Sequence, residues 1–244
     1  MKVVIAIDSL KGSLSSMDAG NAIKEGILKA VDAEVIVKPL ADGGEGTTDA
    51  LIEGMGGEKI SLTVKGPLET PVDAYYGYLK ESNTAIMEMA AASGITLIPK
   101  EALNPLKATT YGVGEMIKDA IRRGIRNFII GIGGSATNDG GTGMLTALGY
   151  EFLDADGQPV GFGGQCLEKI ASISAENRLA ELDECHFKIA CDVENPLCGL
   201  KGATYIYGPQ KGASDSLLPL LDAGMQNYGH AAETFTGKHT MEMA

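Results

Sequence analysis

Residues 3–8 read VVIAID, and this stretch decides the expected fold. An apolar, mostly β-branched run that ends at an acid is typical of a strand buried on both faces of a parallel sheet. A loop rich in serine, glycine and lysine follows, and apolar residues then recur at helical spacing over residues 19–31. Ser15 or Ser16 can cap that helix. The chain is therefore expected to begin with a strand followed by a helix.

The same pattern repeats over the next twenty-odd residues. Residues 34–39 (EVIVKP) predict a second strand, residues 41–46 form a glycine-rich loop, and residues 47–55 predict a second helix. This order of strand, helix, strand and helix is typical of half of a doubly wound α/β sheet.

A different pattern begins at Gly66 and Pro67. Turn residues separate short strands, which predicts an antiparallel meander at 62–64, 72–79 and 84–89. We therefore predict a domain boundary near Lys65, with one α/β domain over residues 1–65 and a second α/β domain, with a mixed sheet, over residues 66–244. The other elements predicted in the second domain are a helix at 115–123, strands at 127–132, 187–190 and 204–207, and a helix at 214–228.

Composition excludes several classes of function. The 244 residues carry 32 Asp and Glu against 20 Lys and Arg, a formal net charge of -12, which disfavours nucleic acid as a partner. The four cysteines match no zinc-site spacing and are typical of reduced thiols. There is no run of about 18 apolar residues, and the first apolar run is too short for a signal peptide, so we expect a cytoplasmic protein without a membrane helix.

The densest glycine cluster is GIGGSATNDGGTG at residues 131–143, between a predicted strand and a helical segment. Backbone N–H groups without neighbouring Cβ atoms can converge on an anion, and a helix N-terminus adds partial positive charge. Ser135, Thr137, Asn138 and Asp139 favour anion binding over a purely conformational role for the glycines. The segment matches neither the P-loop nor the dinucleotide fingerprint.

Two earlier loops also follow predicted strands. In the loop at residues 42–47, Asp42 and Glu45 could hold Mg²⁺, or could satisfy turn and helix amides, and the pattern leaves both open. At the exit of the first strand, Lys11 could offer a charge to a phosphate or a carboxylate, although solvated loop lysines are common.

Four further polar residues have both a functional and a structural interpretation. Asp192 follows a short apolar strand and could orient or deprotonate a hydroxyl, and Asn195 could hold a metal or substrate oxygen, but both could instead cap the turn. Glu88 lies in an apolar run, so that it has either a basic partner or a role in a site. Lys211 could contact phosphate, or could be a surface lysine.

These segments occur together in an order that resembles the bacterial type I glycerate kinase family. The motifs that carry the resemblance are residues 5–13, 41–47, 87–94, 131–141, 190–196 and 207–214, which span nearly the whole chain. The resemblance implies two α/β domains, one of them flavodoxin-like, with the active site in the cleft between them. It implies transfer of the γ-phosphoryl group of ATP to D-glycerate with Mg²⁺, giving 2- or 3-phosphoglycerate, of which 2-phosphoglycerate is favoured.

The resemblance also implies roles for individual residues. It assigns catalysis to Asp192, Lys11 and Asp42, with Asp192 positioning or deprotonating the acceptor hydroxyl, and it assigns Mg²⁺ to Asp42 and Glu45. The residues implied to bind substrate or nucleotide are Asp8, Ser13, Gly43, Gly44, Glu45, Glu88, Gly133, Gly134, Ser135, Asn138, Asp139, Asn195 and Lys211. Within that set, the backbone amides of Gly133, Gly134 and Ser135 are expected to hold phosphate.

Members of the family are longer than this chain, so we expect the C-terminal part that completes the flavodoxin-like sheet to be lacking. Residues 1–65 would then supply only part of a sheet that needs about five strands. The open edges of such a sheet favour a homo-oligomer or a complementing second chain. A non-catalytic nucleotide- or phosphate-binding fragment is the alternative function.

Overall fold

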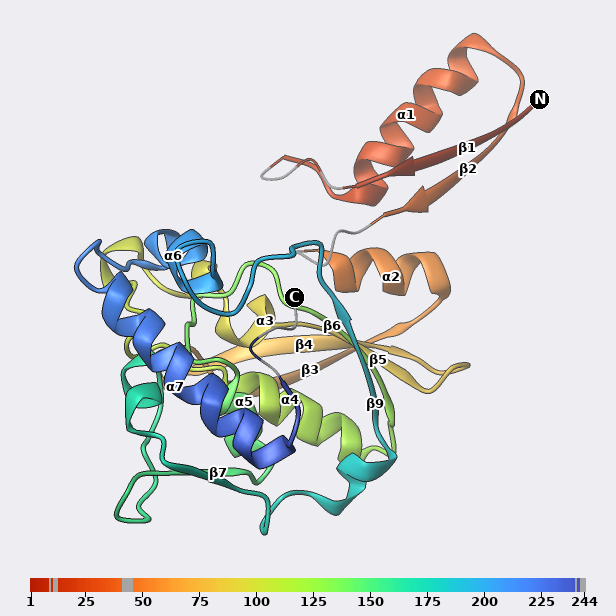
Figure 1. The fold of residues 1–244 in the computed structure, drawn as a ribbon. Coiled ribbons are helices and arrows are strands. Elements are labelled where there is room, and N and C mark those ends of the chain that lie inside the picture. Colours follow the sequence, from red (N-terminus) through yellow and green to blue (C-terminus); the bar gives the residue numbers. More distant parts are fainter. Residues whose placement is uncertain (9, 11–12, 41–45, 240, 242–244) are drawn as a thin grey trace.

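The structure is a computed structural model that describes residues 1–8, 10, 13–40, 46–239 and 241. Within them the chain forms a two-stranded parallel sheet, a five-stranded mixed sheet and a two-stranded antiparallel sheet (Figure 1). The expected mixed α/β class is confirmed, whereas the flavodoxin-like completion of the first sheet stays a prediction.

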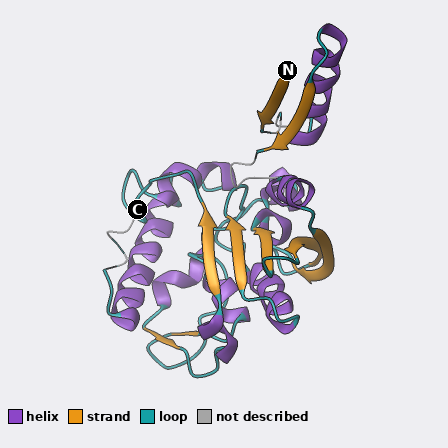
Figure 2. Cartoon of the chain, turned by 90° about the vertical axis from the view of Figure 1, so that its right-hand side faces the viewer, coloured by secondary structure: helices purple, strands orange, loops and turns teal. Residues whose placement is uncertain are grey.

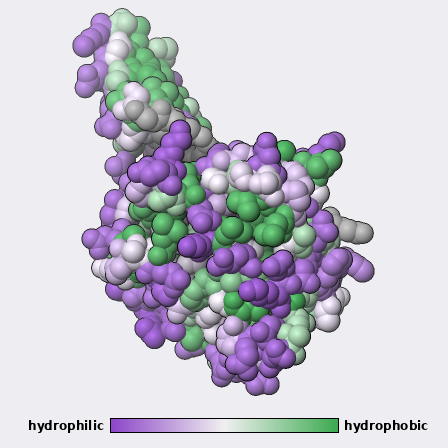
Figure 3. Space-filling model, turned by 90° about the vertical axis from the view of Figure 1, so that its left-hand side faces the viewer, coloured by the Kyte–Doolittle hydropathy of each residue, from purple (hydrophilic) through white to green (hydrophobic). Residues whose placement is uncertain are grey.

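The first unit consists of β1 (Lys2–Ile7), α1 (Ser16–Ala30) and β2 (Glu34–Pro39), as predicted. β1 and β2 pair in parallel, and the Ser15 side chain caps α1 by accepting a hydrogen bond of 3.1 Å from the Asp18 amide. This unit stands apart from the rest of the chain in Figure 2. Figure 3 shows hydrophobic side chains along one side of it, and Val4 is 57% exposed.

The five-stranded sheet has the order β3-β4-β5-β6-β9 and follows α2 (Thr47–Met55). Its strands are β3 (Glu58–Lys65), β4 (Pro71–Leu79), β5 (Thr84–Glu88), β6 (Asn127–Gly131) and β9 (His186–Ala190). The expected antiparallel meander is confirmed for β3, β4 and β5, while β5, β6 and β9 run parallel. β3 pairs with β4 across the boundary proposed near Lys65, and that boundary stays a prediction.

The main core lies between this sheet and α4 (Tyr111–Arg122). Val113, Met116, Ile117, Ala120 and Ile121 recur at helical spacing and are all buried, so that one face of α4 packs on the sheet. The helix starts four residues before the predicted 115–123. Beside it lies α5 (Thr142–Ala147), which follows the glycine cluster.

Shorter elements connect these parts. They are α3 (Ala90–Ser93), β7 (Glu151–Leu153), β8 (Ser172–Ser174) and the 3-10 helices Ile95–Leu97, Lys100–Ala102, Gly164–Lys169, Ala180–Glu184 and Pro209–Lys211. β7 and β8 pair antiparallel beside a second core that includes Phe152, Leu167 and Met225.

The predicted strand at 204–207 is wrong, because this segment forms the helix α6 (Ala203–Tyr207). Its run of Thr, Tyr and Ile has high β propensity, but α6 packs against α7 (Leu218–Thr236), and the Thr204 hydroxyl is buried against Asn138. Tertiary contacts therefore override local preference. The predicted helix at 214–228 is confirmed as α7, which ends later, at Gly237 in the left-handed region (φ 69°). None of the described helices is long and apolar enough to cross a membrane.

Candidate active site

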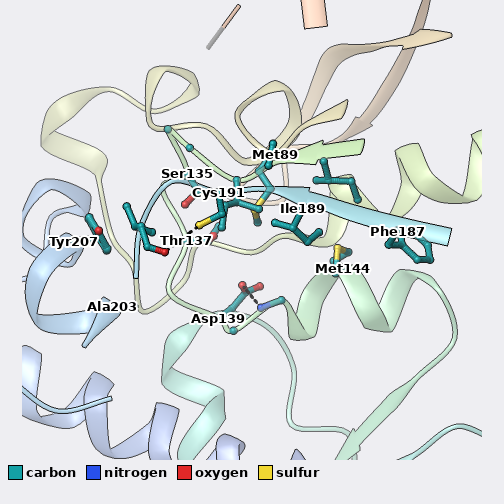
Figure 4. Close-up of a pocket in the computed structure, with 18 of the residues that line it drawn as sticks. Met89, Ser135, Thr137, Asp139, Met144, Phe187, Ile189, Cys191, Ala203 and Tyr207 are labelled. Atoms are coloured by element: carbon teal, nitrogen blue, oxygen red, sulfur yellow. Dashed lines mark hydrogen bonds between the residues drawn. The ribbon is translucent and has the colours of Figure 1, made fainter. Parts of the chain in front are cut away.

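Three parallel strands end in register at one edge of the five-stranded sheet. Glu88 of β5 lies opposite Gly131 of β6, which lies opposite Ala190 of β9. The carboxyl edge of a parallel sheet is where α/β proteins bind ligands. Here it opens into a cavity of about 1740 Å³ that is lined by segments following all three strands (Figure 4).

The cavity brings together nine of the predicted site residues. They are Ser13, Gly133, Gly134, Ser135, Asn138, Asp139, Asp192, Asn195 and Lys211. Asp8 and Glu88 are described but do not line it. The predictions for Lys11, Asp42, Gly43, Gly44 and Glu45 fall outside the described residues.

The glycine cluster presents its backbone to the cavity. The Gly134 carbonyl accepts a hydrogen bond of 2.9 Å from Ile95, and the Ala136 amide donates one of 2.8 Å to Ser93, which ties the loop to α3. The amides of Gly133, Gly134 and Ser135 donate to no described residue. Gly134 has a φ of 70°, which a side chain would strain. Three unpaired donors on consecutive residues suit an anion.

Asp139 faces inward and fixes this loop. Its carboxylate is 1% exposed and accepts hydrogen bonds from the Thr110 amide and hydroxyl, both 2.8 Å, and from the amides of Gly141 (3.1 Å) and Gly143 (3.3 Å). Burial raises the pKa of this carboxyl above its ordinary value, against the hydrogen bonds from Thr110, Gly141 and Gly143, which lower it. The carboxylate thus joins the starts of α4 and α5, and direct ligand binding by Asp139 stays a prediction.

Lys211 contacts the same loop from the 3-10 helix that follows α6. Its Nζ donates to the Thr137 carbonyl at 2.6 Å and to Ser135 Oγ at 3.1 Å. Burial lowers the pKa of Lys211 to about 8, while the Asp139 charge acts in the opposite direction. Lys211 is therefore no ordinary surface lysine: its ammonium group lies at the proposed phosphate loop and still carries its charge at neutral pH.

Asparagine side chains hold the loops of the cavity against α6. Asn195 accepts a hydrogen bond of 2.6 Å from the Tyr207 hydroxyl and donates one of 2.9 Å to the Lys201 carbonyl. Asn138 donates one of 3.2 Å to Thr204 Oγ1. The turn-capping interpretation of Asn195 thus has direct support, and ligand binding by either asparagine stays a prediction.

Among the residues that the structure describes, Glu88 has no basic partner, and it does not line the cavity. Its carboxylate, 6% exposed, accepts hydrogen bonds from the amides of Thr48 at 2.7 Å and Gly46 at 3.2 Å, at the start of α2. Burial raises the pKa of Glu88, and these hydrogen bonds oppose that rise. The backbone amides at the N-terminus of α2 therefore stabilise the buried carboxylate of Glu88 in the way that a basic side chain would.

Sequence reasoning missed the apolar part of the cavity. Met89, Met144, Phe187 and Ile189 line it together with Tyr207, and Figure 4 shows Phe187 and Ile189 on the strand that crosses the view. Phe187 and Ile189 are two residues apart on β9, so their side chains share a face, and this alternation was the available signal. Tyr207 begins the motif at 207–214, but the wrong assignment of its segment to a strand gave no reason to place its side chain in the cavity.

Comparison with known proteins gives the family. A profile of the Glycerate kinase family matches residues 3–244. A glycerate kinase of Haemophilus influenzae is 46% identical over 245 residues, which cover 100% of this chain and 65% of that protein. A glycerate 2-kinase of Escherichia coli is 46% identical over 229 residues, which cover 93% of this chain and 60% of that protein.

A solved structure shares the fold. It belongs to a Salmonella typhimurium LT2 protein described as a candidate glycerate kinase 2, with a TM-score of 0.92 and 44% identity, and the match covers 100% of this chain and 66% of that one. This chain thus spans 65% and 60% of the length of the two curated relatives. With a family profile that matches nearly every residue, the chain belongs to the glycerate kinase family.

Proposed function

We propose that this chain carries the phosphoryl-transfer site of a kinase that moves the γ-phosphoryl group of ATP to D-glycerate, with 2-phosphoglycerate as the favoured product. Relatives named glycerate kinase, and one named glycerate 2-kinase, support the substrate class. One observation carries the proposal: the unpaired amides of Gly133, Gly134 and Ser135, the ammonium group of Lys211 and the carboxylate of Asp192 all line one cavity.

The triphosphate is assigned to the loop after β6. Three consecutive amides can donate to phosphate oxygens without the cost of burying a charged side chain, and Lys211 adds positive charge beside them. The apolar surface along Phe187 and Ile189 offers room for the uncharged part of the nucleotide.

Asp192 is assigned to the acceptor hydroxyl because the other acids of the cavity are already engaged. Four aspartates line the cavity in the described part of the chain, and three of them have partners. These pairs are Asp49 with Lys59 at 2.8 Å, Asp183 with Arg178 at 2.7 Å, and Asp139 with Thr110, Gly141 and Gly143. Asp192 makes no hydrogen bond or ion pair with any described residue, which makes it the acid of the cavity that we assign to a ligand.

In the proposed step, a glycerate hydroxyl attacks the γ-phosphorus and a new oxygen–phosphorus bond forms. The bond from the γ-phosphorus to the bridging oxygen breaks, ADP leaves with the electron pair, and the hydroxyl proton passes to Asp192. Phosphoryl transfer relies mainly on positioning and on neutralisation of charge. The loop amides and Lys211 supply both at the transferring group.

Mg²⁺ belongs to the proposal as the ion that neutralises phosphate charge when bound. The described residues contain no group of three or more His, Cys, Asp or Glu that could cage a metal. An ion held mostly by phosphate oxygens and water needs only one or two carboxylates from the protein. Asp42 and Glu45 remain the proposed protein ligands, and they lie outside the described residues.

The test mixes the chain with ATP, Mg²⁺ and D-glycerate, and identifies the product by phosphorus NMR. We expect 2-phosphoglycerate from the wild type, and a loss of about a hundredfold or more in kcat for Asp192→Asn, since general-base catalysis contributes on that order. Glu194→Gln is the matched control, because it removes an exposed carboxylate of the same loop that does not line the cavity.

Two results would contradict the proposal. A folded Asp192→Asn protein that keeps most of its turnover removes the assignment of Asp192. Binding of ATP without any turnover favours the alternative, a non-catalytic nucleotide- or phosphate-binding fragment. Cytoplasmic location and assembly into a homo-oligomer, or with a complementing chain, also remain proposals.

A further inference from the structure

Glu88 is a buried carboxylate whose hydrogen-bond partners in the described part of the chain lie at the start of α2. Its two hydrogen bonds come from Thr48 and Gly46, and the described part of the chain places no basic side chain against it. The charged residue that acts on it is Asp49, which repels it. A buried charge is costly unless it is compensated, and here the amides and dipole of α2 provide the compensation. Such an arrangement fixes both groups in place.

Glu88, the last residue of β5, also pairs with β6, the strand that leads into the proposed phosphate loop. It lies opposite Gly131 in the sheet, and the amide of the next residue, Met89, donates a hydrogen bond of 2.9 Å to the Gly131 carbonyl. The loop with the unpaired amides begins two residues after Gly131. The backbone around Glu88 is therefore hydrogen-bonded to the strand end from which that loop starts.

Gly46 connects this anchor to the cavity. It lines the cavity, it is the N-cap of α2, and its amide is one of the two donors to Glu88. We infer that Glu88 is a positioning residue, which holds the start of α2 and the cavity wall at Gly46 in fixed relation to the loop after β6. The inference rests on the proposed function for the identity of the ligands.

The rest of α2 has anchors of its own. It packs on β4 and β5, and Ile52 lies so close to Gly77 that a Cβ on that glycine would be 2.8 Å from it. Loss of the Glu88 hydrogen bonds therefore leaves the helix packed on the sheet. Only its first turn is expected to loosen, which makes variants of Glu88 suitable for a test.

The test compares the wild type with Glu88→Gln, Glu88→Ala and Glu53→Gln. The first variant keeps one acceptor oxygen, and the second removes both. The third is the matched control, since Glu53 is an exposed acid of the same helix, away from its N-terminus. Hydrogen–deuterium exchange of the peptide that contains Gly46 and Thr48 reports the anchor directly.

We expect exchange in that peptide to accelerate about tenfold or more in Glu88→Ala, less in Glu88→Gln and not at all in Glu53→Gln. The KM for D-glycerate is expected to rise about tenfold in Glu88→Ala, with a smaller change in kcat and with nucleotide affinity within about twofold of the wild type. This split follows because the loop after β6 and Lys211 hold the phosphates independently of α2.

Unchanged exchange in Glu88→Ala overturns the inference. Equal loss of nucleotide and glycerate affinity, together with a general loss of stability, also overturns it in favour of a merely structural role. If the wild type shows no turnover, the proposed function fails, and the exchange data alone then decide whether Glu88 anchors the start of α2.

Discussion

Removal of the Asp139 carboxylate is expected to loosen the loop that carries the proposed phosphate site. The side chain is 1% exposed and accepts four hydrogen bonds, of 2.8, 2.8, 3.1 and 3.3 Å. At about 1 kcal/mol for each buried hydrogen bond, Asp139→Ala would lose about 4 kcal/mol. Relief from burying a charge returns part of this, so we expect a net loss of about 3 kcal/mol.

Asp139→Asn should be milder because it keeps one acceptor oxygen. Oδ2 accepts three of the hydrogen bonds, and Oδ1 accepts only the one from Gly141. When the amide oxygen of the asparagine takes the place of Oδ2, those three hydrogen bonds are kept. The NH₂ group then faces the Gly141 amide, and the hydrogen bond from Gly141 is lost. We therefore expect a loss of about 1 kcal/mol.

The dependence on pH has a definite sign. Burial raises the pKa of Asp139 above its ordinary 3.8, so the folded chain binds a proton at a pH at which the unfolded chain has lost it. Stability contributed by this group is therefore greatest at low pH and falls as the pH rises through the raised pKa. The advantage of the wild type over Asp139→Asn should grow as the pH is lowered from 7 toward 4.

Urea unfolding followed by far-UV circular dichroism measures these differences, since the chain has no tryptophan. Asp156→Asn, in an exposed turn, is the control and should match the wild type. An Asp139→Ala protein within about 1 kcal/mol of the wild type would refute the reasoning. A wild-type advantage over Asp139→Asn that shrinks on acidification would refute the sign of the pKa shift.

Two further predictions concern the same loop. Lys211→Met should weaken nucleotide binding about tenfold or more at pH 7, as measured by calorimetry. The difference in nucleotide affinity between the wild type and the variant should be smaller at pH 9, because the wild-type lysine, with its pKa lowered to about 8, has then lost its charge. An equal difference at both pH values would contradict this. Gly140→Ala should cost about 2 kcal/mol or more in urea unfolding, because φ is 58° and the new Cβ would lie 2.7 Å from the Tyr228 ring. Gly124→Ala, at φ 84° with nothing within 4 Å, should cost only about 1 kcal/mol, and equal losses would contradict the steric argument.

Local signals were sufficient for most elements of the fold. The second strand and the second helix have the predicted bounds, Glu34–Pro39 and Thr47–Met55, because apolar period and glycine punctuation are both local. α6 shows the limit of such signals. Its residues favour a strand on their own, and only the contacts with α7 and Asn138, distant in the sequence, make it a helix.

Most residues of the candidate site could be predicted from the sequence, but the hydrogen-bond partners of its buried acids could not. The glycine cluster, Lys211 and Asp192 follow strands or loops in ways that a sequence displays, and the structure brings them to one cavity. The partners of the buried acids were not predictable. Asp139 pairs with Thr110, and Glu88 pairs with Gly46, across stretches of sequence that no periodicity connects.

The arrangement of charges is compatible with the proposed polyanion site on an acidic chain. A net charge of -12 opposes a triphosphate, but charges farther than about 8 Å are screened at physiological ionic strength, so the nearby groups dominate. Near the glycine loop, backbone amides donate hydrogen bonds to the two buried acids: those of Thr110 and Gly143 to Asp139, and that of Thr48 at the start of α2 to Glu88. Because those two carboxylates are engaged from within, the unpaired amides and the ammonium group of Lys211 supply the positive part of the local field at the proposed phosphate loop.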